Sequence, residues 1–131
     1  MKTLLITRHG YENLKKELEI FYKSQAREYI KKRCHELAQE HGFTYKSIRI
    51  TSAVTRWGSC SSQRSLNFSY RLIMAPRDAI DYVIIHELCH LREMNHSARF
   101  WKQVYDIMPE YKNHEKHLKT DGWRYRIVCK N

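Results

Sequence analysis

The first third of the chain carries a helical pattern of apolar side chains. Residues 11–41 contain no glycine or proline, and apolar or aromatic side chains recur there every three or four positions, the spacing of one face of an α-helix. Gly42 follows, and glycine is the residue type that most often ends a helix. We therefore predict one long amphipathic helix over residues 11–41, and we expect its first half to extend beyond the compact body of the protein.

The pattern then changes to the alternation that is typical of strands. Residues 46–51 and 66–72 alternate polar with apolar side chains, as half-buried strands do. Between them, residues 56–65 contain serine and glycine and can form a further strand and a turn. This region predicts a small, mostly antiparallel sheet.

A second helix is predicted where the chain becomes apolar on nearly every side. Pro76 suits the first turn of a helix, and Asp78 and Asp81 would lie near the positive end of the helix dipole. Residues 79–85 are apolar except for one aspartate, and a helix that is apolar all round is a buried one. We expect this helix to end near Asn95, because asparagine tolerates left-handed backbone geometry.

Two shorter helices are predicted after it. Ser97 is a natural N-cap for the first of them, and residues 111–118 form the second. A strand-like tail follows over residues 123–128. A long helix, a small sheet and further helices indicate a single α+β domain, with an N-terminal helical segment over residues 1–44 and a core over residues 45–131.

Candidate chemistry lies inside the apolar helix, in the run H-E-L-C-H. His86 and His90 are four residues apart, so both imidazoles lie on one helix face and can bind one metal ion. Glu87 stands where a carboxylate can take a proton from a metal-bound water molecule. Buried histidines and a buried carboxylate need partners, and a metal ion supplies one. The pattern indicates a catalytic zinc site; the alternative is a pair of hydrogen-bonded core histidines with Glu87 at the surface.

The third metal ligand is less constrained by spacing. A catalytic zinc ion usually has three protein ligands and one open position. His96 is the favoured candidate, because a turn after the helix could return it to the metal, and its spacing equals that of metzincins. Glu93 faces roughly the same way as His90, and Glu110 or Glu115 on a later helix would complete a set of two histidines and one glutamate.

The charge of the chain suggests an anionic partner. Lysine and arginine number 24 against 14 acidic residues, a formal net charge of +10. Such a balance favours proximity to nucleic acid, although the basic residues are spread along the chain and a basic solubilising surface also explains them.

Cysteine usage and hydropathy indicate the compartment. The four cysteines are widely spaced and form no C-x-x-C pair, which argues against a zinc ribbon and favours free thiols that are mostly buried. Cys89 is expected to pack inward. No apolar stretch is long enough to cross a membrane, and the apolar patch in the first eight residues is too short for a signal peptide, so we expect a cytoplasmic protein.

Several short motifs of the sequence closely resemble the motifs of one protein family. They are R-W-G-S-C-S at 56–61, L-N-F at 66–68, R-L at 71–72, A-P at 75–76, D-Y-V at 81–83, H-E-L-C-H-L at 86–91 and N-H-S-x-x-F-W at 95–101. In combination they resemble the YgjP-like predicted metal-dependent hydrolases, a group related to the WLM and SprT-like metalloproteases. The resemblance runs from about residue 45 to about residue 112.

This resemblance implies a zincin-type fold of minimal size. It implies one Zn²⁺ ion at His86, His90 and His96, with Glu87 as the catalytic base. One departure stands out: family members commonly carry a longer N-terminal portion rich in strands, whereas residues 1–44 here are essentially one helix. Substrate contacts from that portion are therefore expected to be missing or replaced.

The resemblance also places the R-W-G-S-C-S segment beside the active-site cleft. Its cleft candidates are Arg56, Trp57, Gly58, Ser59 and Cys60. Gly58 would allow a close backbone approach, and a strand edge there could pair with an extended peptide. The plainer alternative is that Trp57 belongs to the core and Gly58 to a bulge. Cys60 is expected to be a buried structural thiol, with an inhibitory zinc thiolate as the alternative.

The leading hypothesis is a zinc metallopeptidase that acts on peptide or protein substrates and has no membrane partner. One alternative is zinc-dependent hydrolysis of an amide outside proteins, since the site defines the attack and not the substrate. A third hypothesis is a nucleic-acid-associated protein, either a DNA-stimulated protease or a module whose zinc is not catalytic.

Overall fold

The structure is a computed structural model that describes residues 7–125, apart from the side chain of Trp123. The N-terminal apolar patch, the second half of the predicted tail strand and Cys129 lie outside the described residues. Residues 122–125 form a short 3-10 helix, so this part of the tail is not a strand. No helix among the described residues is long and apolar enough to span a membrane.

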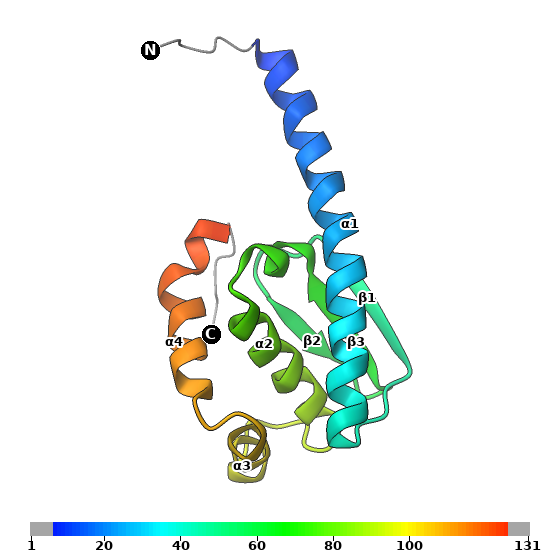
Figure 1. Cartoon of the computed structure of the whole chain (residues 1–131), viewed down its shortest axis with the longest axis vertical. Coiled ribbons are helices and arrows are strands. Elements are labelled where there is room, and N and C mark those ends of the chain that lie inside the picture. Colours follow the sequence, from blue (N-terminus) through cyan, green and yellow to red (C-terminus); the bar gives the residue numbers. More distant parts are fainter. Residues whose placement is uncertain (1–6, 126–131) are drawn as a thin grey trace.

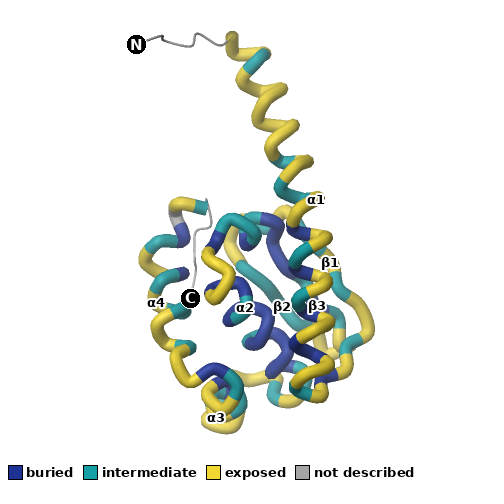
Figure 2. The backbone as a smooth tube through the Cα atoms, in the orientation of Figure 1, coloured by how far each residue is buried: buried dark blue, intermediate teal, exposed yellow. Residues whose placement is uncertain are grey.

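The long N-terminal helix is confirmed as α1, Arg8–His41. Thr7 caps its start by accepting a hydrogen bond from the Gly10 N–H at 3.0 Å, and Gly42 ends it with a left-handed φ of 72°. Its buried residues are Ala26, Ile30, Cys34, Leu37 and Ala38. All of them belong to the second half, and the first half projects beyond the body, as expected (Figures 1 and 2).

Three short strands form one sheet: β1 (Ser47–Thr51), β2 (Gly58–Cys60) and β3 (Ser65–Ser69). Their order is β1-β3-β2, with β1 parallel and β2 antiparallel to β3. The sheet is therefore mixed rather than mostly antiparallel. Alternation of side chains predicts a strand and its buried face, but it carries no information about which strand becomes the neighbour. The chain turns into a 3-10 helix, η1 (Tyr70–Met74), where we expected the last strand to continue.

The site-bearing helix is α2, Arg77–His90, and ten of its fourteen residues are buried. It lies between α1 and α4 (Tyr111–Asp121) and also contacts α3 (Ala98–Ile107) and β2 (Figure 1). Asp78 lies in its first turn as predicted, whereas Asp81 instead accepts two hydrogen bonds from the Arg33 guanidinium of α1, at 2.8 and 2.9 Å. α2 is therefore the central element against which the rest of the domain packs.

α2 ends at His90 and not near Asn95. The turn that follows is held to the end of α1, because the Arg92 side chain donates to the carbonyl oxygens of His41 and Gly42 at 3.1 and 3.0 Å. The Arg92 guanidinium also lies 4.0 Å from the ring centre of Phe43, a cation–π contact. This anchored turn redirects the chain toward Ser97, which caps α3 by accepting from the Phe100 N–H.

Candidate metal site and active-site cavity

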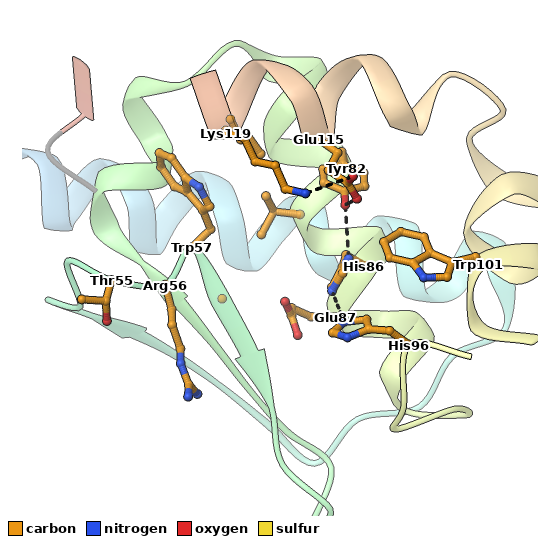
Figure 3. Close-up of a pocket in the computed structure, with 13 residues that line it drawn as sticks. Thr55, Arg56, Trp57, Tyr82, His86, Glu87, His96, Trp101, Glu115 and Lys119 are labelled. Atoms are coloured by element: carbon orange, nitrogen blue, oxygen red, sulfur yellow. Dashed lines mark hydrogen bonds and ion pairs between the residues drawn. The ribbon is translucent and has the colours of Figure 1, made fainter. Parts of the chain in front are cut away.

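Three histidine side chains converge at the end of α2 (Figure 3 labels His86 and His96). Their Nε2 atoms are separated by 3.2 Å between His86 and His96, 3.3 Å between His86 and His90, and 3.1 Å between His90 and His96. Within residues 7–125 these three are the cluster of histidine, cysteine or acidic side chains that could hold a metal ion. The turn after α2 thus brings His96 to the pair, and the alternatives Glu93, Glu110 and Glu115 lie outside the cluster.

The geometry of the cluster fits a tetrahedral metal ion. Zinc binds imidazole nitrogen at about 2.0–2.1 Å, so two such ligands in a tetrahedron lie about 3.3 Å apart, close to the observed separations. The Nδ1 atom of His90 lies 2.9 Å from the carbonyl oxygen of Glu93, which can only accept a hydrogen bond. His90 Nδ1 must therefore carry the hydrogen, and in the neutral ring Nε2 presents a lone pair to the cluster.

Burial also prepares two of the histidines to bind a metal. Desolvation is the largest cause that lowers the pKa of His86 to about 3, and the neighbouring His90 and His96 contribute to this lowering. Desolvation is likewise the largest cause that lowers the pKa of His90. Both rings are neutral near pH 7, and a neutral imidazole is the form that coordinates metal.

Aromatic rings from α3 hold two of the histidines in place. The Phe100 ring stacks on His90 with ring centres 4.3 Å apart, and the Trp101 ring stacks on His96 at 5.7 Å. The ring of Tyr111, from α4, stacks on the ring of Trp101 with ring centres 5.2 Å apart. In the sequence, Phe100 and Trp101 stood out only as part of the N-H-S-x-x-F-W motif. Their contacts explain why they occur in the N-H-S-x-x-F-W word: they orient the rings of the cluster.

Glu87 is buried beside the cluster, against β2. Desolvation raises its pKa to about 8, and the charge of Arg56 opposes this rise. A Cβ atom added at Gly58 would lie 3.1 Å from the Glu87 Cγ and equally close to the Asn67 carbonyl oxygen and the Phe68 ring. Gly58 pairs in regular antiparallel register with Phe68, so it is not a bulge. The glycine therefore allows β2 to approach Glu87 closely, because a side chain at this position would press on its neighbours. Glu87 is at the site and not at the protein surface.

A cavity of about 450 Å³ opens beside Glu87 (Figure 3). It is lined by Thr55, Arg56, Trp57, Gly58, Tyr82, Val83, His86, Glu87, His96, Trp101, Glu115, Leu118 and Lys119. Three of the five cleft candidates, Arg56, Trp57 and Gly58, are among these residues. Trp57 also packs edge-on against Tyr125, and its Nε1–H is buried with no hydrogen-bond partner among the described residues.

Ser59 and Cys60 lie next along β2 but are not among the lining residues of the cavity. The Ser59 hydroxyl accepts a hydrogen bond from the Asn67 side chain at 3.3 Å. Burial raises the pKa of the Cys60 thiol to about 11, with a smaller contribution from the charge of Glu87. Cys60 is therefore a protonated, half-buried thiol and does not belong to the metal cluster. Cys34 and Cys89 are free and buried, as expected.

Two further residues have roles at the site that the sequence did not indicate: Tyr82 was not singled out, and Glu115 was considered only as an alternative metal ligand. The Tyr82 hydroxyl donates to the Glu115 Oε2 at 3.3 Å, and it lies 3.3 Å from the Nδ1 of His86. Tyr82 precedes His86 by one helical turn, and this spacing is the signal that could have found it. Nothing in the local sequence connects either residue with Glu115, which comes from α4.

Comparison with known proteins agrees with this geometry. Residues 2–121 match the family described as YgjP-like, metallopeptidase domain. The match includes α1, which we had expected to lie outside the resemblance. No curated protein gives a significant match to the chain.

Two solved structures share the fold. The metallopeptidase zymogen abylysin of Pyrococcus abyssi has a TM-score of 0.65 and 20% identity, covering 76% of this chain and 99% of its own. The metallopeptidase zymogen jannalysin of Methanocaldococcus jannaschii has a TM-score of 0.59 and 20% identity, covering 72% of this chain and 96% of its own. At this identity the likeness concerns the fold, which is that of a minimal, zincin-like domain.

Proposed function

Because the chain belongs to the YgjP-like metallopeptidase family, we propose that it is a zinc peptidase in which Glu87 is the general base. The observation that carries this proposal is the convergence of three Nε2 atoms within 3.1–3.3 Å of one another, next to a buried carboxylate that lines a cavity. Structural zinc sites are closed by four protein ligands, whereas a set of three leaves a position for water.

His86, His90 and His96 would hold the metal through their Nε2 atoms. A zinc ion bound there supplies Lewis-acid activation of a water molecule and of the scissile carbonyl group. The all-imidazole donor set and its tetrahedral spacing support zinc as the metal in this proposal.

Glu87 would move the proton. Its carboxylate accepts a proton from the attacking water and later donates it to the leaving amine. Burial that raises its pKa to about 8 makes the carboxylate a better proton acceptor near neutral pH than an exposed glutamate. Gly58 leaves room for the Glu87 side chain beside β2, where an added Cβ atom would lie 3.1 Å from its Cγ.

The substrate would be an extended peptide lying along β2. This strand is at the edge of the sheet, with β3 as its neighbour, so its other edge can pair with an added strand. Trp57 lies in the cavity wall and can pack against an apolar side chain of the peptide. Arg56 and Gly58 also line this side of the cavity. We propose that the side chains of Ser59 and Cys60 do not contact the substrate and that these residues contribute only to the backbone of β2.

Two other expectations stand as parts of this proposal. We propose that the net charge of +10 attracts a nucleic acid whose binding increases cleavage. The cleavage assay with and without DNA measures this effect. We also propose a cytoplasmic location and one domain, with a helical segment over residues 1–44 and a catalytic core over residues 45–131.

The test combines metal analysis with a peptide-library and casein cleavage assay, with and without DNA. We expect about one zinc ion per chain and cleavage by the wild type. Glu87→Gln should keep its zinc but lose cleavage by about 10²–10⁴-fold, since its amide cannot accept the proton. Glu110→Gln, at an exposed glutamate, is the matched control. Unchanged turnover in Glu87→Gln would exclude Glu87 as the base.

The ligand set is tested by His96→Ala, with exposed His35→Ala as its control. We expect zinc content to fall sharply only in His96→Ala. Normal zinc occupancy in that variant would mean that His96 is not a ligand. Zinc binding without cleavage of any peptide, with or without DNA, would favour a non-protein amide substrate or a non-catalytic metal module.

A further inference from the structure

We propose that Tyr82 and Glu115 are positioning residues that hold His86 in the one tautomer able to bind a metal through Nε2. The proposal rests on the proposed function only in that a metal ion binds the histidine cluster. It concerns the direction of two hydrogen bonds, from His86 to Tyr82 and from Tyr82 to Glu115.

The direction follows from the donors and acceptors that meet there. The Tyr82 hydroxyl lies 3.3 Å from Glu115 Oε2 and 3.3 Å from His86 Nδ1. An ionised carboxylate only accepts, so the single hydroxyl hydrogen points to Glu115. The lone pair of the hydroxyl is then left for His86, whose Nδ1 must donate. A neutral imidazole carries one hydrogen, and Nε2 is left with a lone pair that faces the other two histidines.

The elements that carry these groups fix the arrangement. Tyr82 and His86 share one face of α2 at a spacing of four residues, and only 5% of the Tyr82 surface is exposed. Glu115 comes from α4, and its second oxygen lies 3.5 Å from the Lys119 ammonium group. Figure 3 shows Lys119, Glu115, Tyr82 and His86 as one chain of contacts along the cavity wall. The packing of α4 on α2 therefore orients a metal-facing side chain.

His90 provides an internal contrast. Its Nδ1 donates to the backbone carbonyl of Glu93 at 2.9 Å, so no side-chain substitution removes the acceptor. His86 has a side chain as its acceptor, and that side chain depends on Glu115. His86 is thus the histidine whose tautomer can be released by mutation, and Tyr82→Phe removes the acceptor with the loss of a single oxygen.

The first measurement is zinc affinity, by competition with a chelating dye. Outer partners of ligating histidines typically contribute 10–100-fold to metal affinity, so we expect Tyr82→Phe and Glu115→Ala each to bind zinc 10–100-fold more weakly. Glu115→Gln keeps an oxygen acceptor for the hydroxyl and should bind zinc more tightly than Glu115→Ala. The controls are Tyr105→Phe and Glu110→Ala, both at exposed positions, and their affinity should equal that of the wild type.

The second measurement is the tautomer of His86 in the metal-free protein, from the ¹⁵N chemical shifts of the imidazole at neutral pH. The wild type should show hydrogen on Nδ1, and Tyr82→Phe should shift the population toward hydrogen on Nε2. His90 should keep hydrogen on Nδ1 in both proteins. A merely structural role for Tyr82 would not change the tautomer of one histidine alone.

The double variant Tyr82→Phe, Glu115→Ala tests whether the two residues act in series. We expect its zinc affinity to equal that of Tyr82→Phe alone, because Glu115 acts through the hydroxyl. If Tyr82→Phe does not fold, the comparison of Glu115→Ala with Glu115→Gln tests the same hydrogen bonds. Glu115 is partly exposed, so its substitution disturbs the core less.

The outcomes separate this proposal from the proposed function. Wild-type protein that binds no zinc would overturn the proposed function, while the tautomer of His86 would still test the hydrogen-bond directions. Tight zinc binding by the wild type, together with unchanged affinity and unchanged His86 tautomer in Tyr82→Phe and Glu115→Ala, would overturn the positioning role and leave the proposed function intact.

Discussion

α2 and the first half of α1 contain similar apolar side chains in opposite surroundings. Ten of the fourteen α2 residues are buried, and its Leu88 is fully inaccessible. In α1 the buried residues begin only at Ala26, and Leu18 is 46% exposed. Figure 2 shows the contrast as a dark central helix and a yellow projecting one.

The comparison teaches what apolar periodicity does and does not predict. Spacing of three and four residues predicts the helix of α1, whereas a run that is apolar on nearly every side predicts the buried helix α2. Whether the apolar face is covered depends on the elements that reach it. α2 meets α1, α3, α4 and β2, and these neighbours bury Glu87 and His90 and partly bury His86. The first half of α1 carries no group of the site, and the two regions should therefore respond differently to matched substitutions.

The largest difference should come from leucine truncation. Leu88→Ala removes a fully buried side chain next to the site, and we expect a loss of about 2–5 kcal/mol in the free energy of unfolding. Leu18→Ala is the matched control and should change it by less than about 0.5 kcal/mol. Urea unfolding of both metal-free variants gives the comparison. A large loss in Leu18→Ala would mean that the first half of α1 is covered in solution.

The second difference concerns pH. Burial raises the pKa of Glu87 from an ordinary 4.5 to about 8, so the folded protein keeps a proton that the unfolded chain releases between these values. The contribution of Glu87 to stability therefore decreases as pH rises through this window. Metal-free Glu87→Gln lacks this titration, so its stability relative to the wild type should increase from pH 4.5 to pH 8 by about 5 kcal/mol.

Exposed Glu17 of α1 provides the control for this pH effect. Glu17→Gln should leave the dependence of stability on pH parallel to that of the wild type, as measured by thermal unfolding across the same window. A Glu87→Gln profile that also runs parallel to the wild type would show that the Glu87 carboxyl is not desolvated in solution.

The smallest difference should be between two ion pairs. Arg33 joins α1 to α2 through two hydrogen bonds to Asp81, whose side chain is 18% exposed. We expect Arg33→Gln to reduce the free energy of unfolding by about 1–2 kcal/mol. Glu19 and Lys23 pair at 3.1 Å on the projecting half of α1, with 42% and 30% exposure, and Glu19→Gln should change stability by less than about 0.5 kcal/mol. Equal losses of stability in Arg33→Gln and Glu19→Gln would mean that the pair between α1 and α2 stabilises the fold no more than the exposed pair.

Elements with strong local signals could be predicted from the sequence. The apolar spacing and Gly42 predicted α1, and Ser97 predicted the start of α3, because caps and periodicity act within one turn of helix. The placement of His86 and His90 on one helix face followed from the same local logic, whereas His96 was only the favoured candidate for the third ligand. The early end of α2 did not, since Arg92 holds that turn through a contact with residues about fifty positions away.

Features that depend on contacts between distant elements could not be predicted. The alternation of polar and apolar side chains in β1 and β3 does not indicate that these two strands pair in parallel. The contact between Tyr82 and Glu115 spans 33 positions of the chain, and either residue alone looks like an ordinary helix position. The resemblance placed Gly58 beside the active-site cleft. The close approach of this glycine to the Glu87 side chain is visible only in the structure.

The different chain distances within the site have a consequence for the order of folding. His86 and His96 are separated by ten positions, whereas Tyr82 and Glu115 are separated by 33. Loop-closure entropy grows with the logarithm of loop length, so closing the histidine cluster requires about 1 kcal/mol less than closing the contact with α4. During synthesis or refolding, the imidazoles can therefore meet and capture a metal ion before α4 docks. The arrival of Glu115 would then be the late step that locks the ring of His86.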